Sequence, residues 1–123
     1  MIKGIGTDII DIVRIKKIIA KDGRFIEKVF TGSEISYCES MSRREIHYAA
    51  RFAAKEALFK ALGTGYRDGM SWKDISVKND ELGKPGIELS GKTLDNFKKK
   101  KLRNIHLSIS HTKEYAVSFV VID

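Results

Sequence analysis

The sequence predicts an α+β fold in which helices, mainly from the first half of the chain, pack on a small antiparallel sheet. Apolar residues recur at helical spacing through most of residues 9–62, and they alternate with polar residues from 105 onward. Between these parts, residues 79–85 are rich in turn formers and separate two short strand-like segments. A length of 123 residues with 42% hydrophobic content fits one compact domain, which we expect to span residues 1–123.

The first segment is expected to be a strand from Ile2 to Asp8, which is short, β-branched and contains two glycines. A glycine inside a strand often marks the close approach of another backbone or of a ligand. A helix is expected over residues 9–20, where the isoleucines follow helical spacing. Asp8 would then end the strand, and its simplest structural role is the N-cap of that helix.

Two further helices carry boundary signals. Thr31 and Glu34 form a capping box, which predicts a helix through about Cys38. We interpret Cys38 as a small buried group rather than a nucleophile, since nothing near it in the sequence marks it as activated. The main helix is expected over residues 43–62, and Gly63 stands where a left-handed C-terminal cap belongs.

The second half is expected to supply most of the sheet. The last two strands should form a hairpin, and the first strand of the chain should join them. The expected elements are a strand that includes Trp72, Ile75 and Val77, a return strand at 86–89, a helix at about 93–100, and the hairpin strands 105–111 and 115–122.

The charge of the chain favours acidic partners. Its formal net charge is +7, and its densest basic stretch, Lys98–Lys101, is by itself typical of a solvated helix end. The single cysteine excludes an intrachain disulfide, and neither a signal-peptide pattern nor an apolar run of membrane-spanning length is present. We therefore expect a cytoplasmic protein without a membrane partner.

The main helix places Glu56 and Lys60 four residues apart on one face. Taken alone, such a pair is typical of a solvated ion pair that stabilises the helix slightly. A stripe of small residues lies beside it, where another backbone or a flat ligand has room to approach closely. The stripe consists of Ala53, Ala57 and Ala61.

Asp8 and Glu56 are two carboxylates in an otherwise basic chain. Proteins commonly bind Mg²⁺ through one or two carboxylates, together with waters and substrate phosphates. Lys60 would face the same space and neutralise a phosphate, an arrangement suited to displacement at a phosphoryl centre. No Walker loop accompanies these residues. His111 is either a histidine at the edge of the sheet or, with Thr112, part of an anion site.

Four stretches combine these residues in a characteristic order within a short chain. They are Gly6–Ile9, Phe52–Ala57, Lys60–Gly65 and Ser110–Ala116. Together they resemble the motifs of the holo-acyl-carrier-protein synthases, the short single-domain type of 4'-phosphopantetheinyl transferase. The similarity runs from end to end and includes Arg24-Phe25 and the Gly-Lys-Pro turn at Gly83.

The resemblance implies a specific reaction. Members of this family transfer 4'-phosphopantetheine from coenzyme A to a serine of apo-acyl carrier protein, release adenosine 3',5'-bisphosphate and require Mg²⁺. The product, holo-acyl carrier protein, supports fatty acid biosynthesis. The resemblance also implies a homotrimer with sites between neighbouring chains, and an acidic carrier protein suits the positive charge of this chain.

The resemblance assigns roles to residues of this sequence. It implies that Asp8 and Glu56 hold the metal and that Lys60 contacts phosphate, all three belonging to the catalytic site. The general base stays open between Glu56, a water on the metal and a carboxylate of the carrier protein. Coenzyme A would be bordered by Arg51, Lys60, Gly63, His111 and Thr112, and the carrier protein would dock on Arg14, Ile18, Arg24 and Phe25.

Two other interpretations compete with this one. A small basic RNA-binding module would explain the net charge and the lysine run. However, the sequence lacks an aromatic RNA-binding signature, and that interpretation leaves Asp8 and Glu56 without a role. We therefore expect no nucleic-acid partner. The larger two-domain transferases of secondary metabolism do not fit a chain of this length.

Overall fold

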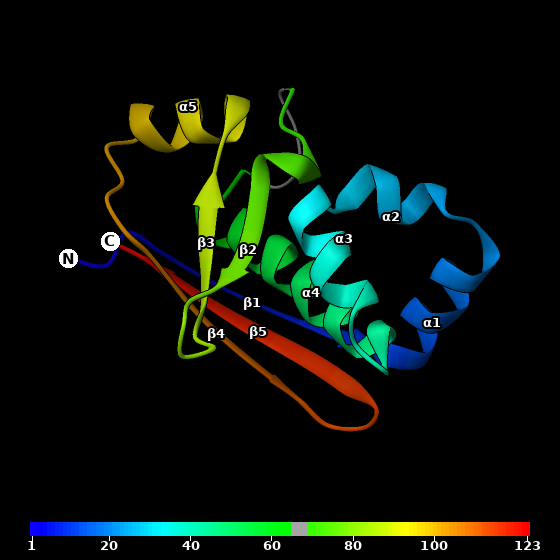
Figure 1. The fold of residues 1–123 in the computed structure, drawn as a ribbon. Helices are drawn as coiled ribbons and strands as arrows, with labels where there is room; N and C mark the ends of the chain where they lie inside the picture. The colour runs from blue at the N-terminus through cyan, green and yellow to red at the C-terminus, as the bar shows by residue number, and fades with distance from the viewer. Residues whose placement is uncertain (65–68) are drawn as a thin grey trace.

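The computed structural model describes residues 1–64 and 69–123 and has the predicted α+β architecture (Figure 1). Gly65, the last residue of one predicted motif, lies outside the described residues. In chain order the elements are β1 (Gly4–Asp11), α1 (Ile12–Lys21), α2 (Arg24–Val29), α3 (Gly32–Glu39), α4 (Arg44–Leu62), the 3-10 turn η1 (Trp72–Asp74), β2 (Ile75–Asn79), β3 (Pro85–Leu89), α5 (Gly91–Lys99), β4 (Ile105–His111) and β5 (Tyr115–Ile122).

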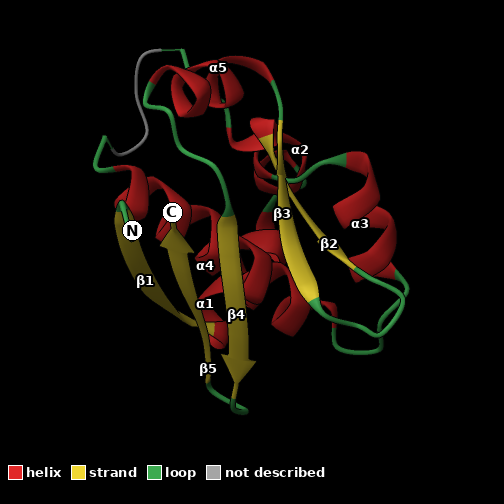
Figure 2. Ribbon diagram, turned by 90° about the vertical axis from the view of Figure 1, so that its left-hand side faces the viewer, coloured by secondary structure: helices red, strands yellow, loops and turns green. Residues whose placement is uncertain are grey.

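The strands form two antiparallel sheets. The larger has the order β1-β5-β4, which confirms that the last two strands make a hairpin and that the first strand joins it. The hairpin β2–β3 is a separate two-stranded sheet, and Figure 2 shows it standing beside β4. In the larger sheet, Asp8 of β1 lies opposite Ser118 of β5, and Ser118 in turn lies opposite Ile109 of β4.

Helix α4 packs directly on β1 through small residues. A Cβ atom on Gly4 would overlap the carbonyl oxygen of Ala61, and one on Gly6 would overlap that of Ala57. The alanine stripe and the strand glycines therefore serve the approach of two backbones. The sequence left open whether the stripe accommodates another backbone or a ligand. In the structure it accommodates the backbone of β1.

The end of β1 corrects one sequence prediction. The strand continues to Asp11, so Asp8 lies inside it and the following helix begins at Ile12 rather than near residue 9. Asp11 is the N-cap, and its Oδ1 accepts hydrogen bonds from the backbone N–H groups of Val13 at 3.0 Å and Arg14 at 3.4 Å. The two isoleucines before it are paired with β5, and this pairing outweighs their helical spacing.

Other local predictions are confirmed. Thr31 and Glu34 make the capping box of α3, and Gly63 ends α4 with a φ of 76°. Trp72, in contrast, lies in η1 rather than in a strand. The Cys38 side chain is fully buried, and desolvation raises the pKa of its thiol to about 12, which agrees with a packing role.

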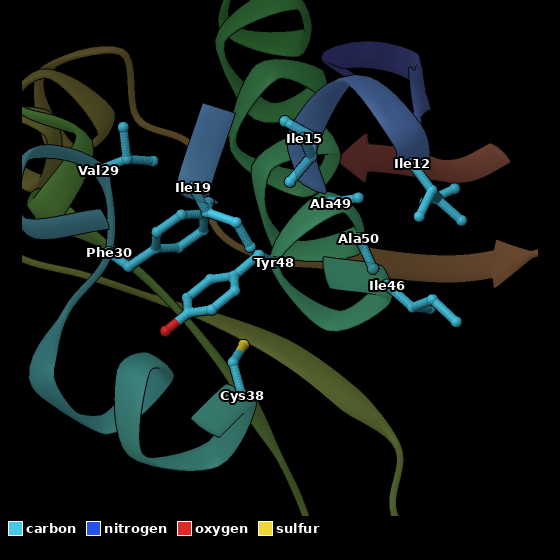
Figure 3. Close-up of a cluster of buried hydrophobic side chains, with 11 residues drawn as sticks. Ile12, Ile15, Ile19, Val29, Phe30, Cys38, Ile46, Tyr48, Ala49 and Ala50 are labelled. Atoms are coloured by element: carbon cyan, nitrogen blue, oxygen red, sulfur yellow. The ribbon is translucent and has the colours of Figure 1, made fainter. Parts of the chain in front are cut away.

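Two clusters of buried side chains surround α4. Figure 3 shows the cluster formed mainly by the first half of the chain, where the rings of Phe30 and Tyr48 lie side by side with centroids 4.8 Å apart. The second cluster joins the carboxyl half of α4 to the strands and α5. Among the described residues, no helix has the length and apolar character needed to cross a membrane.

A buried ion pair links these parts. The Lys55 side chain is fully buried in α4, and its Nζ donates to Glu34 Oε1 at 2.7 Å, to the carbonyl of Val29 at 2.6 Å and to that of Trp72 at 3.1 Å. Glu34 Oε2 accepts from the backbone N–H of Val77 at 2.8 Å. One side chain of α4 therefore connects α2, α3, η1 and, through Glu34, β2.

The face of the larger sheet turned away from α4 is apolar and exposed. Along β5, buried Ala116, Ser118 and Val120 alternate with residues on this outer face. Large apolar side chains from β1 and β5 occupy the outer face, with Ile9 63% and Phe119 46% exposed. Isolated surface apolar residues need no explanation, whereas a contiguous group of this kind is typical of surfaces that bind a partner.

Candidate active site

The candidate site is a pocket of about 400 Å³ where β1 and α4 face α1 and α2. Asp8 enters it from the middle of β1, and Glu56 enters from α4. The two carboxylates come from elements that are packed backbone to backbone, so their spacing is fixed by the fold. The lining residues are Asp8, Ile9, Ile10, Asp11, Arg14, Ile15, Ile18, Phe25, Phe52 and Glu56.

Lys60 completes the polar side of this site. Its Nζ donates to Asp8 Oδ1 at 3.0 Å and to the backbone carbonyl of Thr7 at 2.9 Å. The sequence left open an ion pair between Lys60 and Glu56 within the helix. In the structure the ammonium group instead crosses from α4 to the strand.

The two carboxylates have different surroundings. Asp8 Oδ2 is buried and accepts no hydrogen bond from the residues that the structure describes. Glu56 is half-buried, and its pKa is raised first by desolvation and then by the negative charge of Asp8, while Lys60 acts in the opposite direction. A cation bound here would stabilise both the unpaired buried oxygen of Asp8 and the ionised form of Glu56.

The donor set fits a hard divalent cation. Residues 1–64 and 69–123 contain no group of three or more acidic, histidine or cysteine side chains arranged to hold a metal. Two carboxylates alone suit Mg²⁺, which keeps several waters and takes further ligands from substrate phosphates. The predicted pair, Asp8 and Glu56, therefore meets in the structure in an arrangement that suits the predicted metal.

The apolar side of the pocket contains most of the predicted docking residues. Arg14, Ile18 and Phe25 all line it, and the ring of Phe25 lies 5.4 Å from that of Phe52 of α4. Arg24 is not part of the lining. Its side chain is 90% exposed and makes an ion pair with Asp22 at 3.3 Å. The pocket thus opens beside a basic and apolar rim formed by α1 and α2.

The predicted coenzyme A residues do not gather at this pocket. His111 and Thr112 lie at the end of β4, on the far side of β5 from β1, and neither lines the pocket. Thr112 Oγ1 accepts from the backbone N–H groups of Glu114 at 3.2 Å and Tyr115 at 3.1 Å, so it shapes the turn between β4 and β5.

Arg51 and Gly63 also lie outside the lining. Arg51 is only 4% exposed, with its guanidinium carbon 4.1 Å from the centre of the Tyr37 ring and its Nε atom buried without a hydrogen-bond partner in the described part of the chain. Gly63 caps the end of α4, one turn beyond Lys60. Within one chain, Arg51, Gly63, His111 and Thr112 therefore all lie outside the lining of the carboxylate pocket.

The sequence did not predict the roles of two residues, Asp11 and Lys55. Asp11 lines the pocket and caps α1, a role the sequence analysis gave to Asp8. An acidic residue directly before a run of helical spacing was an available signal for it. Lys55, which is joined to Glu34, looked like an ordinary helix lysine, and its burial depends on residues distant in the sequence.

Comparison with known proteins agrees with this geometry. The chain belongs to the 4'-phosphopantetheinyl transferase superfamily, because the model of that family matches residues 4–120. A holo-[acyl-carrier-protein] synthase of Clostridium tetani (strain Massachusetts / E88) is 50% identical to it over 123 residues, covering 100% of this chain and 97% of that protein.

Solved structures show the same fold. The crystal structure of holo-[acyl-carrier-protein] synthase from Neisseria meningitidis matches with a TM-score of 0.93 and 34% identity, covering 100% of this chain and 99% of that one. A holo-(acyl-carrier-protein) synthase from Bacillus anthracis str. Ames, in complex with CoA (3',5'-ADP), matches with a TM-score of 0.82 and 43% identity, covering 99% and 96%.

Proposed function

We propose that this chain is a holo-[acyl-carrier-protein] synthase that transfers 4'-phosphopantetheine from coenzyme A to a serine of apo-acyl carrier protein. Family membership over residues 4–120 establishes the class of enzyme, and the relatives named above carry this activity in their names. The structural observation that carries the proposal is the pairing of Asp8 with Glu56, with Lys60 bonded to Asp8, beside an open pocket.

Asp8 and Glu56 would hold Mg²⁺. When bound, the cation would neutralise charge that develops on the phosphate oxygens during transfer. Lys60 lies one turn of α4 beyond Glu56 and would donate to a nonbridging phosphate oxygen, the second source of positive charge at the site. The raised pKa of Glu56 also suits a group that accepts the proton of the serine hydroxyl, and a water on the metal or a carboxylate of the carrier protein are the alternatives for that role.

The carrier protein would dock on the rim of the pocket. Arg14 supplies a positive charge, while Ile18 and Phe25 supply apolar contact. Arg24 would add an exposed charge beside them. A carrier protein of this kind is acidic, so an enzyme with a net charge of +7 attracts it and accelerates encounter. Docking there would bring the serine of the carrier to the mouth of the pocket that contains Asp8.

The binding site for coenzyme A would be completed by a neighbouring chain. We propose a homotrimer in which the pocket of one protomer faces His111 and Thr112 of the next, with Arg51 and Gly63 also contacting the nucleotide. Two features support this assembly: the exposed apolar face formed by β1 and β5, and the position of His111 at the sheet edge opposite Asp8. A cleft between chains encloses a ligand of this size more readily than one small domain does.

The remaining parts of the proposal follow from the activity. Residues 1–123 would work as one transferase domain, located in the cytoplasm and supplying holo-carrier protein for fatty acid biosynthesis. No membrane or nucleic acid is required for this reaction. The RNA-binding alternative has no comparable support, because it gives no role to the carboxylates that the fold brings together.

The direct test is a transfer assay. The purified chain is incubated with coenzyme A, Mg²⁺ and apo-acyl carrier protein, and the mass of the intact carrier is measured over time. We expect the carrier to gain one phosphopantetheine group and adenosine 3',5'-bisphosphate to appear in equal amount. Omission of Mg²⁺, and replacement of the acceptor serine by alanine, should each abolish the gain. A carrier mass that stays unchanged under all conditions would contradict the proposal.

A further inference from the structure

Lys60 already bonds to the carboxylate expected to hold the cation. Its Nζ lies 3.0 Å from Asp8 Oδ1, and this contact joins the last turn of α4 to the middle of β1. The Asp8 side chain is 14% exposed, whereas that of Lys60 is 56% exposed. The carboxylate is therefore fixed in the fold, and the ammonium group is the partner with freedom to move.

The charges in this corner make the two possible partners of Asp8 oppose each other's binding. Asp8, Glu56 and Lys60 face one another there, and Arg14 lies on the rim of the same pocket. A divalent cation on the Asp8 oxygens would stand only a few ångströms from the Lys60 ammonium, where like charges repel strongly. The ammonium would also keep one of the two Asp8 oxygens engaged in a hydrogen bond.

Lys60 needs another acceptor if it leaves Asp8. Its second hydrogen bond, to the carbonyl of Thr7 at 2.9 Å, is with a neutral group and replaces an ion pair poorly. Two other carboxylates line the pocket: Asp11 already accepts the first N–H groups of α1, and the cation requires Glu56 as well. A phosphate ester entering the pocket supplies the missing negative charge.

We propose that Lys60 competes with the divalent cation for Asp8, so that the site binds the cation weakly alone and tightly together with a phosphate ester. The phosphate draws Lys60 away from Asp8, the cation takes its place, and the two ligands raise each other's affinity by the same factor. This inference rests on the proposed function, which identifies the phosphate ester as coenzyme A.

The test measures cation binding directly. Mn²⁺, which also favours carboxylate oxygens, is titrated into the full-length protein while free Mn²⁺ is followed by electron paramagnetic resonance. The variant Lys60→Met removes the charge and keeps the length of the side chain. We expect it to bind Mn²⁺ about tenfold more tightly than the wild type without coenzyme A, since one close positive charge has been removed.

Two further variants locate the effect. Lys78→Met is the matched control, because Lys78 is 52% exposed and its Nζ lies 3.3 Å from Glu88 Oε2 on a distant hairpin. Its Mn²⁺ affinity should equal that of the wild type. Asp8→Asn, combined with Lys60→Met, should lose the tighter binding. If the gain survives in that double variant, or also appears in Lys78→Met, the cation binds elsewhere and the proposal is overturned.

Coenzyme A supplies the second half of the test. In the wild type it should raise the affinity for Mn²⁺, and this increase should be about tenfold larger than in Lys60→Met, where no lysine has to be displaced. If coenzyme A raises the Mn²⁺ affinity equally in the wild type and in Lys60→Met, the coupling is overturned. If Lys60→Met binds Mn²⁺ no more tightly than the wild type without coenzyme A, the competition is overturned. The same conclusion holds if neither protein binds Mn²⁺ in the accessible concentration range.

The outcome separates this inference from the proposed function. A wild-type protein that modifies the carrier, together with a Lys60→Met variant that gains no affinity for Mn²⁺, would overturn the competition and leave the transferase activity standing. A wild-type protein that modifies no carrier, together with the expected gain in Lys60→Met, would overturn the transferase activity and support the competition for Asp8.

Discussion

The carbonyl oxygen of Ala57 lies so close to the α-carbon of Gly6 that α4 and β1 meet without a side chain between them. Glu56 directly precedes Ala57, and Asp8 follows Gly6 by two residues on the same face of the strand. The contact between these two backbones therefore sets the distance between the two carboxylates of the site.

Gly6→Ala tests this relationship. The added methyl group would overlap the Ala57 carbonyl oxygen, which cannot rotate away, so α4 and β1 must separate. We expect a loss of about 3 kcal/mol in the free energy of unfolding, at the upper end of overpacking effects. Urea unfolding measures it. Gly32→Ala is the control, since a Cβ there meets no atom within 4 Å, and it should be neutral or slightly stabilising. Equal stabilities for the two variants would disprove the close contact.

Asp8→Ala and Glu56→Ala should separate activity from stability. Neither side chain belongs to the buried apolar core, and Glu56 is half-buried at the pocket. We expect neither variant to unfold at a much lower temperature than the wild type, and each to lose transferase activity by at least about 100-fold, the loss typical when charge stabilisation in a transition state is removed. Activity is measured across Mg²⁺ concentrations. Near-normal turnover by Glu56→Ala would exclude this residue from the site.

Glu56 also predicts a pH dependence of stability. Burial and the Asp8 charge raise its pKa above the ordinary 4.5, so its ionised form disfavours the folded state. This penalty is absent at low pH, where the carboxyl is protonated in both states, and develops as pH rises through the raised pKa. Glu56→Gln should therefore be more stable than the wild type at about pH 8 and equally stable near about pH 4. Thermal unfolding of both proteins across this range provides the comparison, and a less stable Glu56→Gln at high pH would contradict it.

Arg14→Glu should affect the carrier protein selectively. Arg14 lies on the rim of the pocket, so charge reversal should raise the KM for the carrier several-fold and leave the KM for coenzyme A nearly unchanged. Added salt should reduce the wild-type rate at low carrier concentration, because screening shortens the Debye length to about 10 Å at 0.1 M. Lys99→Glu, on α5, changes the net charge equally and should behave like the wild type. If both KM values rise together in Arg14→Glu, the residue belongs to the nucleotide site or to the fold.

A mixture of two inactive variants tests the shared site. Asp8 and His111 lie on opposite edge strands of one sheet, and we expect the trimer to bring Asp8 of one chain to His111 of the next. Asp8→Ala and His111→Ala proteins are refolded together, and native mass spectrometry verifies that the chains have mixed. Mixed trimers contain some junctions with both residues intact, so measurable activity should return. A fully mixed but inactive sample would place both residues in the site of a single chain.

The sequence predicted those parts of the site that depend on local spacing. Glu56 and Lys60 share a helix, and the motif context led to Asp8 as their partner across the fold. The sequence did not predict that β1 extends to Asp11, because the isoleucines before Asp11 satisfy helical spacing and strand pairing equally well. Only pairing with β5, from the other end of the chain, decides between these alternatives.

The burial of the Lys55–Glu34 ion pair could not be predicted from the sequence either. The capping box at Thr31 and Glu34 was readable from four residues, but it accounts for only one oxygen of the Glu34 carboxylate. The other oxygen accepts a hydrogen bond from Val77, and the ion pair with Lys55 is buried by the segments that both residues join. A lysine in a helix is exposed in most proteins, so no local pattern predicts its burial.

The pairing of β1 with β5 also has a consequence for biosynthesis. Residues 4–11 emerge from the ribosome before their hydrogen-bonding partners, residues 115–122. The strand that carries Asp8 therefore has no β5 to pair with until residues 115–122 have been made, and we expect the carboxylate pocket to form only after that point. A nascent chain that stalls before β5 would have α4 and Glu56 but would lack the strand that pairs with β1, so we expect such a truncated chain to be inactive.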